Sequence, residues 1–239
     1  MSNKFLDLGY GEINLNTGCP SGTVTSKGKG AGMLRNLDEL CNFLDEIFTK
    51  TVVSISVKTR IGFESPEEFP EILAIFNRYP IKELIIHPRV RNAFYNGDVA
   101  TGAFAYGLAH SNAPVCYNGN LNTLEDIQKI SQQFPDVQAV MLGRGLIGDP
   151  GMVSFGGTDI AKLETFMEEL LEEYLVTFGG SRNAMFRLKE HWRYLLQKFE
   201  GNEKLGKKLR KTTDLVEYKS ITREIFHNLP LRKTLDANW

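Results

Sequence analysis

Five short apolar runs alternate with longer segments of helical periodicity in the first 150 residues, and this rhythm constrains the fold more than any other feature. Short runs rich in Val, Ile and Leu are typical of parallel strands covered on both faces. Parallel strands joined by right-handed crossovers predict an α/β fold. The predicted strands are residues 12–16, 53–58, 83–87, 115–118 and 139–142, and the helices among them are residues 37–48, 69–76 and 124–130.

Polar residues and glycines gather where the predicted strands end. In a (β/α)₈ barrel these carboxyl ends form the active face. A doubly wound open sheet places its ligands at the same ends, so the pattern alone leaves both architectures open. The residues concerned are Asn16 to Cys19, Lys58 to Arg60, His87 to Arg91, Asn118 to Asn120 and Gly143 to Gly145.

The rhythm changes near residue 159, after which four helices are predicted with no strand between them. We therefore expect two domains, residues 1–158 and 159–239. Residues 181–239 hold 14 Lys and Arg against seven Asp and Glu, whereas residues 1–180 hold 14 against 22. A basic segment of this kind either attracts a polyanion such as nucleic acid or is simply a solvated helical face. The predicted helices are residues 159–178, 181–199, 203–211 and 213–227.

Composition excludes several classes of protein. The 42% hydrophobic and 24% charged residues are close to globular averages, so disorder is not expected. No run reaches the roughly 20 apolar residues that cross a bilayer. The three cysteines are odd in number and far apart, which predicts reduced thiols and a cytoplasmic protein. We expect no metal site.

The sequence Asn-Thr-Gly-Cys-Pro at residues 16–20 is the most specific local signal, because it places Cys19 in a turn directly after the first strand. Such a thiol could reach a ligand at the mouth of the sheet, or it could be a buried cysteine that acts as a small hydrophobe. Cys41, on the apolar face of a helix, and Cys116, within a strand, fit the second interpretation.

Two further strands end in side chains suited to an anionic ligand. Lys58 could meet a ring oxygen or a phosphate, although a lysine there is commonly a surface residue. His87 could donate hydrogen bonds to a cofactor. The glycine elements at residues 118–120 and 143–145 follow the last two strands, where barrel enzymes often build a phosphate site from loops and a helix N-terminus. Arg144 would add a bidentate cation.

In order along the chain, the motifs NTGCP, VKTRIG, IIHPRVR with FYNGD, VCYNGN and MLGRG resemble those of the tRNA-dihydrouridine synthases. The segment FRLKEHWRYLLQKF at residues 186–199 is similar to that family's C-terminal RNA-binding domain. The resemblance implies a (β/α)₈ TIM-type barrel followed by a small all-α domain. It also implies an enzyme that reduces uridines in tRNA to 5,6-dihydrouridine, with FMN as cofactor and NADPH or NADH as reductant.

The resemblance also assigns roles to residues. Cys19 matches the catalytic cysteine that gives a proton to uracil C5, while hydride from reduced FMN reaches C6. Asn16, Lys27 and Arg60 are expected to bind the substrate. The target base must be extruded from the tRNA stack before it can react. The residues expected to bind FMN are Lys58, His87, Asn118, Gly119, Asn120, Gly143 and Arg144.

Two departures from the family pattern follow. Asn120 stands where the family usually has an acidic residue. The chain also opens at what resembles the family's fourth strand, so about 80 to 90 residues of the barrel, at roughly 30 per βα unit, are expected to be absent. An incomplete barrel exposes its edges, which could pair with a second copy or a complementing chain. A tRNA-binding fragment without catalysis, or a barrel oxidoreductase acting on a small molecule, are the alternatives.

Overall fold

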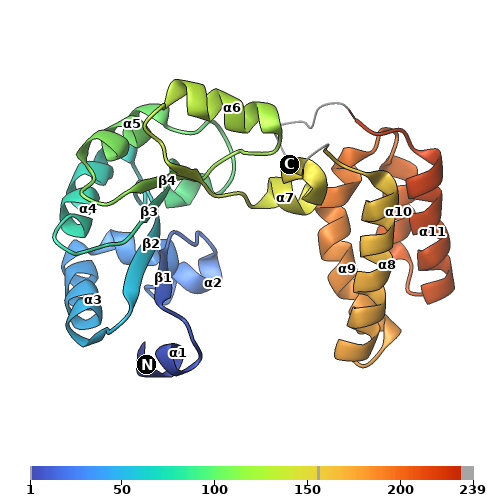
Figure 1. Ribbon diagram of the computed structural model, residues 1–239, viewed down its shortest axis with the longest axis horizontal. Coiled ribbons are helices and arrows are strands. Elements are labelled where there is room, and N and C mark those ends of the chain that lie inside the picture. The colour runs from blue at the N-terminus through green and yellow to red at the C-terminus, as the bar shows by residue number, and fades with distance from the viewer. Residues whose placement is uncertain (1, 155–156, 233–239) are drawn as a thin grey trace. The chain divides into compact units, whose positions relative to one another are not determined.

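The computed structural model describes residues 2–154 and 157–232 (Figure 1). The chain forms two compact units. The first comprises Met1–Gly119 and Lys129–Met141, and the second comprises Asn120–Gln128 and Leu142–Trp239. The expected division into two functional domains, residues 1–158 and 159–239, stays a prediction.

The first unit is built on a parallel sheet of five strands in the order β1-β2-β3-β4-β5. All five predicted strands are present, with small differences at their ends. The order contains no reversal, so the described strands have no switch point of the kind that defines a doubly wound sheet. This favours a barrel-type arrangement. The strands are β1 (Glu12–Thr17), β2 (Ser54–Arg60), β3 (Leu84–His87), β4 (Val115–Tyr117) and β5 (Ala139–Val140).

The two faces of this sheet differ in chemistry, because side chains alternate along each strand. Leu15, Val57, Leu84 and Val115 stand side by side in register on one face, which we call the apolar face. The next row, displaced by one residue, lies on the opposite face, which we call the polar face. It comprises Asn16, Lys58, Ile85 and Cys116.

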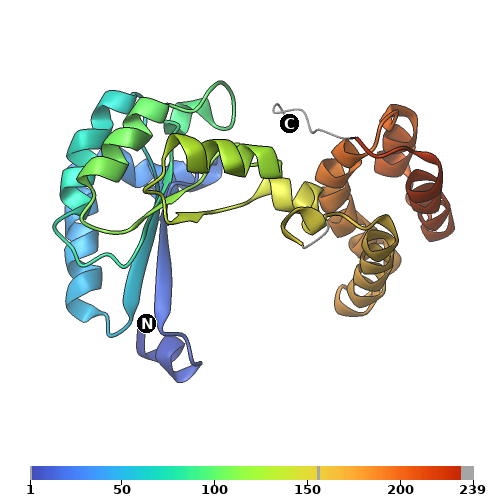
Figure 2. The ribbon, with the colours of Figure 1, turned by 45° about the horizontal axis from the view of Figure 1, so that its top comes forward.

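Helices cover the apolar face, and Figures 1 and 2 both show α3, α4 and α5 on the same side of the sheet. The ring of Phe104 in α5 (Thr101–His110) packs edge-on against Tyr117 at 4.8 Å between centroids. Gly107 lies so close that an added Cβ would be 2.8 Å from both Ile86 and Phe69. The other helices on this side are α3 (Leu37–Lys50) and α4 (Phe69–Phe76), the latter preceded by η2 (Pro66–Glu68).

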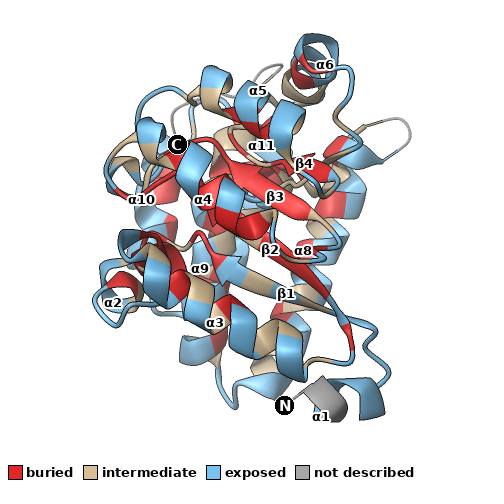
Figure 3. Ribbon diagram, turned by 90° about the vertical axis from the view of Figure 1, so that its left-hand side faces the viewer, coloured by how far each residue is buried: buried red, intermediate tan, exposed pale blue. Residues whose placement is uncertain are grey.

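The expectation that the strands are covered on both faces is not met at β1. Asn14 and Asn16 are exposed on the polar face of this edge strand. By contrast, β3 is buried throughout, and β2 is buried except at Ser54 and, in part, at Lys58 (Figure 3). Polar side chains can occupy β1 because water reaches them there. Cys116, by contrast, is only 3% exposed, which confirms its interpretation as a buried cysteine. Cys41 is half-buried and accepts a hydrogen bond from Arg78 Nη1 at 3.3 Å.

Short elements precede and follow the strands. Ser2–Asp7 forms α1, and the segment after β1 contains α2 (Gly22–Thr25) and η1 (Gly30–Arg35). After β3 comes η3 (Arg91–Ala93), and α6 (Leu124–Gln133) follows β4. Thr123 Oγ1 accepts a hydrogen bond from Asp126 N at 3.1 Å and so caps the N-terminus of α6.

The second unit contains the predicted C-terminal helices. They are preceded by α7 (Arg144–Gly148) and η4 (Pro150–Val153), and the buried Trp192 donates a hydrogen bond from Nε1 to the Tyr218 hydroxyl at 2.8 Å in their core. Over the described residues, no helix is both long and apolar enough to cross a membrane. The helices are α8 (Ile160–Thr177), α9 (Ser181–Leu195) with η5 (Leu196–Lys198), α10 (Glu203–Lys211) and α11 (Leu215–Asn228).

Candidate active site

The turn after β1 is organised by the side chain of Asn16. Its Oδ1 atom accepts hydrogen bonds from the backbone N–H groups of Gly18 and Cys19, each at 3.0 Å. Gly18 lies against β2, where an added Cβ would be 3.1 Å from the carbonyl carbon of Thr59. The turn is therefore held at a fixed distance from the neighbouring strand, and Cys19 follows at its end.

The loop that follows packs tightly behind Cys19. Ala31 N donates to the carbonyl oxygen of Cys19 at 2.9 Å. Gly30 has a φ of +56°, and a Cβ there would be 2.8 Å from that same oxygen. Only glycine meets both demands without strain. Lys27 and Lys29 are exposed on this loop, and the Cys19 side chain is half-buried.

Lys58 is the register neighbour of Asn16 on the polar face of the sheet. Burial lowers the pKa of its ammonium group, and the nearby Arg60 cation lowers that pKa further. Cys19 and Cys116 both lie within electrostatic reach of the amine. In the described part of the chain, no hydrogen bond or ion pair engages the Lys58 amine. A half-buried cation without a counterion is suited to an anionic ligand.

Arg60, two residues further along β2, is buried rather than open to the mouth of the sheet. Its side chain donates from Nε to Gly18 O at 3.0 Å and from Nη1 to Val90 O at 2.8 Å. The guanidinium also lies over the Tyr95 ring, 5.3 Å from its centroid. Burial lowers the pKa of Arg60 to about 10. The expected contact between Arg60 and substrate stays a prediction, because these donors already bind carbonyl groups.

His87 is the register neighbour of Arg60 and is also buried, at the end of β3. Its ring stands edge-on to Tyr95, with 6.1 Å between centroids. Tyr95, which was not among the predicted site residues, is half exposed and contacts both His87 and Arg60. The FYNGD motif, in which this tyrosine lies, was the signal that could have identified it.

Asn118 and Gly119 follow β4 in the first unit. The Asn118 side chain donates from Nδ2 to Met141 O at 2.8 Å, which ties the end of β4 to the segment after β5. A Cβ on Gly119 would contact Val99 at 3.4 Å and Pro88 at 3.5 Å. The first unit therefore brings the strand-end residues onto one edge of the sheet. They are Asn16, Cys19, Lys58, Arg60, His87, Asn118 and Gly119.

The remaining predicted cofactor residues belong to the second unit. Asn120 has a φ of +49°, in the left-handed region. Gly143 precedes α7 and Arg144 begins it. Gly145 lies against the chain after β4, since an added Cβ would be 2.2 Å from Leu121 O. Glycine at residue 145 is thus required for packing within this unit.

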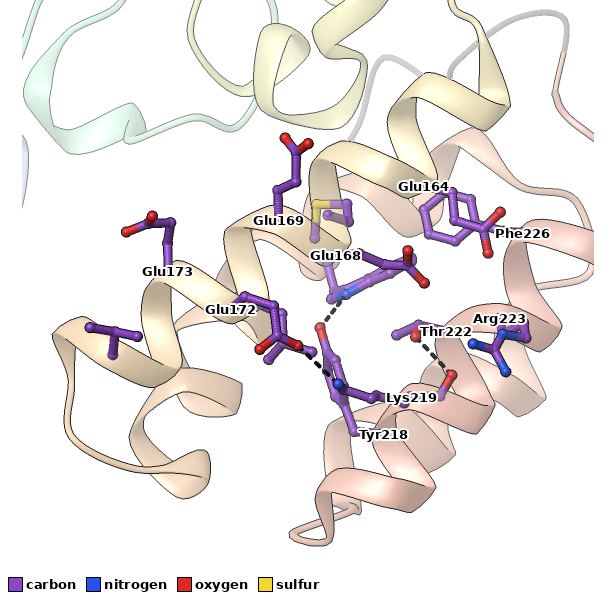
Figure 4. Close-up of a pocket in the computed structure, with 14 residues that line it drawn as sticks. Glu164, Glu168, Glu169, Glu172, Glu173, Tyr218, Lys219, Thr222, Arg223 and Phe226 are labelled. Atoms are coloured by element: carbon purple, nitrogen blue, oxygen red, sulfur yellow. Dashed lines mark hydrogen bonds and ion pairs between the residues drawn. The ribbon is translucent and has the colours of Figure 1, made fainter.

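A groove of about 730 Å³ lies between α8 and α11, and glutamate side chains of α8 line one wall (Figure 4). Glu172 forms an ion pair with Lys219 across the groove at 2.9 Å. Its apolar floor, which includes Trp192, is itself buried. A polyanion would be repelled here, because the glutamates that α8 contributes to the groove outnumber its two cations, Lys219 and Arg223. The glutamates lining the groove are Glu164, Glu168, Glu169, Glu172 and Glu173.

Positive charge is concentrated on α10 instead. The apolar side chains of this helix, Leu205 and Leu209, are buried, and its basic side chains are exposed. The basic excess identified from the sequence therefore begins after α8. The exposed cations of α10 are Lys204, Lys207, Lys208, Arg210 and Lys211.

Parallel strands in sequential order, with a cysteine turn and cationic side chains at their carboxyl ends, define an α/β protein whose strand order is consistent with a barrel. The family model described as dihydrouridine synthase (Dus) matches residues 2–235. The chain belongs to the dihydrouridine synthase family.

Several curated proteins are similar to this chain. A probable tRNA-dihydrouridine synthase of Rhizobium leguminosarum bv. phaseoli is 26% identical, over 84% of this chain and 65% of its own length. The tRNA-dihydrouridine synthase B of Pasteurella multocida is 25% identical, over 95% of this chain and 71% of that protein. The tRNA-dihydrouridine(16) synthase of Shigella flexneri is 30% identical, over 62% and 48% respectively. The chain thus spans about half to seven-tenths of these relatives.

Proposed function

We propose that this protein reduces uridines in tRNA to 5,6-dihydrouridine, with FMN as cofactor and NADPH or NADH as reductant. Membership of the dihydrouridine synthase family supports the reaction class. The observation that carries the proposal is the turn in which Asn16 holds the backbone of Cys19 beside the cationic polar face. In this proposal Cys19 is the proton donor and Lys58 binds an anion at the same end of the sheet.

The polar face fits a flavin. Lys58 is a desolvated cation whose lowered pKa would rise again beside an anionic ring or phosphate. His87 and the backbone of Gly119 lie at the same edge. When bound, reduced FMN would supply the hydride that adds to uracil C6. We assign contacts with the flavin ring and its tail to Lys58 and His87. We assign contacts with the phosphate to Asn118, Gly119, Asn120, Gly143 and Arg144.

Cys19 would carry the proton that neutralises the reduced base. The Sγ atom must hold this proton as a thiol and give it to uracil C5 as a general acid. Asn16 would orient both the Cys19 turn and the uracil base. Its Oδ1 atom is engaged by the turn, which leaves the Nδ2 group to donate a hydrogen bond to a uracil carbonyl.

The decisive experiment is to change Cys19 to Ala and incubate the protein with FMN, NADPH and unmodified tRNA. Loss of one general acid should lower the rate of dihydrouridine formation by about 10²- to 10⁴-fold, measured by mass spectrometry of nucleosides. The Cys41→Ala variant is the matched control and should keep full activity. Equal activity of the two variants would contradict the role of Cys19.

For tRNA we propose contacts from α10 and from Lys27 on the Cys19 loop, because exposed cations neutralise phosphates. Changing Lys204, Lys207 and Lys208 together to Gln should weaken tRNA binding and reduce the slope of log K against log salt by about one per lost contact. The matched control changes Glu168, Glu169 and Glu173 of α8 to Gln and should not weaken binding. Equal loss of affinity in the two variants would contradict a specific role of the α10 cations in tRNA binding.

A second candidate is a tRNA-binding protein without catalysis. It is favoured by the exposure of Asn14 and Asn16 on β1. Retained tRNA binding with no dihydrouridine at any FMN concentration would support it. Activity that appears only with a second copy or a complementing chain would support pairing at the sheet edges.

A further inference from the structure

Arg60 makes two contacts that the proposed reaction does not use. Its side chain reaches the carbonyl oxygen of Gly18, 42 residues earlier, and that of Val90, 30 residues later. Only 2% of the residue is exposed. One buried guanidinium therefore joins the loop after β1 to the loop after β3, across the strand that lies between them.

The contact with Gly18 is informative because Gly18 O and Cys19 N belong to the same peptide unit. Arg60 Nε binds the oxygen at 3.0 Å, and Asn16 Oδ1 binds the N–H group at 3.0 Å. A peptide unit is planar, so holding both of its ends fixes its orientation. The orientation of this plane in turn directs the Cα–Cβ bond of Cys19.

A planar guanidinium is suited to this role. Its N–H groups diverge in fixed directions, so one group can serve two carbonyls that face it from different loops. A lysine ammonium at the same place could approach one carbonyl but has no rigid fork. Arg91 adds a parallel link between the same two loops, because its Nη2 donates to Thr25 Oγ1 at 3.0 Å.

We propose that Arg60 is a positioning residue, which sets the direction of the Cys19 thiol through the Gly18–Cys19 peptide and couples it to the loop after β3. Its meaning for catalysis rests on the proposed function. The positioning itself does not, so it can be tested without flavin, tRNA or turnover.

The test compares Arg60→Gln and Arg60→Lys with the wild-type chain. Two quantities are measured: hydrogen exchange of residues 18–32 and 88–97, and the rate at which iodoacetamide alkylates Cys19. Loss of charge-assisted hydrogen bonds should speed exchange in both loops by about tenfold in Arg60→Gln. The alkylation rate of Cys19 should change at least about threefold, and that of Cys41 should not change. Arg60→Lys should give intermediate values.

Arg78→Gln is the matched control, because Arg78 contacts Cys41 and Tyr79 on the helical side of the sheet. It should leave exchange and alkylation at the Cys19 loop unchanged. If Arg60→Gln does not fold, Arg60→Lys decides the outcome. Wild-type exchange and alkylation in a folded Arg60 variant would overturn the proposal. If that variant also bound tRNA more weakly, Arg60 would be a substrate contact.

Discussion

The two faces of the five-stranded sheet are made by the same strands but have different roles: one is buried in the core, and the other carries the residues of the candidate site. The apolar face buries Val57 and Leu84 completely beneath helices. The polar face sets Asn16 beside Lys58 and ends in Arg60 and His87. A shift of one residue in register would exchange the two faces, so the alternation that stabilises the fold also positions the chemistry.

The polar face has an energetic cost. Lys58 and Arg60 are close to one another, and burial lowers the pKa of both. Desolvated cations of like charge oppose folding, whereas the branched side chains of the other face favour it. Stability is therefore expected to depend mainly on the apolar face and ligand binding on the polar face, and substitutions on each face test this division.

The largest effect is expected at Ile86, which is fully buried on the apolar face against α5. Ile86→Ala should lower the free energy of unfolding by about 2–5 kcal/mol, because it removes buried methyl groups and leaves a cavity. Urea denaturation measures this. Asn14→Ala, on the exposed polar face, is the control and should cost less than about 1 kcal/mol. Similar losses at both positions would break the distinction between the faces.

The next effect is expected at Lys58 and has the opposite sign. Lys58→Met removes a desolvated cation, so it should raise the free energy of unfolding by about 0.5–2 kcal/mol. The same change should weaken FMN binding, followed by flavin fluorescence. His110→Ala, on the far end of α5, controls for general effects on flavin binding. A destabilised variant that still binds flavin normally would show that Lys58 belongs to the stabilising side.

The smallest effect is expected at Glu12, at the start of β1. A hydrogen bond from Lys82, with Nζ to Oε2 at 2.5 Å, lowers the pKa of this carboxyl group below 4.5. The pair is exposed, so Glu12→Gln should cost at most about 0.5 kcal/mol at pH 7. The lowered pKa means that the contribution is present above pH 4.5 and is lost as pH falls through the folded-state pKa. Unfolding measured at several pH values should show the difference disappearing in acid.

Much of the fold could be predicted from local pattern. Periods of two and of three to four residues identified the strands and helices, and turn-formers placed Cys19 at a strand end. The general expectation of strands covered on both faces failed at β1, although the alternation of polar and apolar residues in EINLN already indicated an exposed polar face. The acidic character of α8 was also missed, because its charge was counted together with residues 1–180.

The site was less predictable, because its geometry depends on contacts between distant residues. The motif placed Arg60 near the mouth of the sheet, but only the folded chain reveals that it binds Gly18 and Val90. The role of Asn16 in the turn is local, two and three residues along the chain, and such Asx turns can be anticipated. The contacts of Tyr95, like those of Arg60, join residues that are distant in the sequence, since its partners come from β2 and β3.

The sequential order of the strands has a consequence for how this site can change. Each strand-end loop has at most two immediate neighbours in such an order, so an insertion in one loop has to be accommodated by those neighbours alone. Loops far apart in the series can diversify independently, as modules. New substrate preferences could therefore arise by exchange of a single loop, provided that the side chains bridging it to the next strand are carried along.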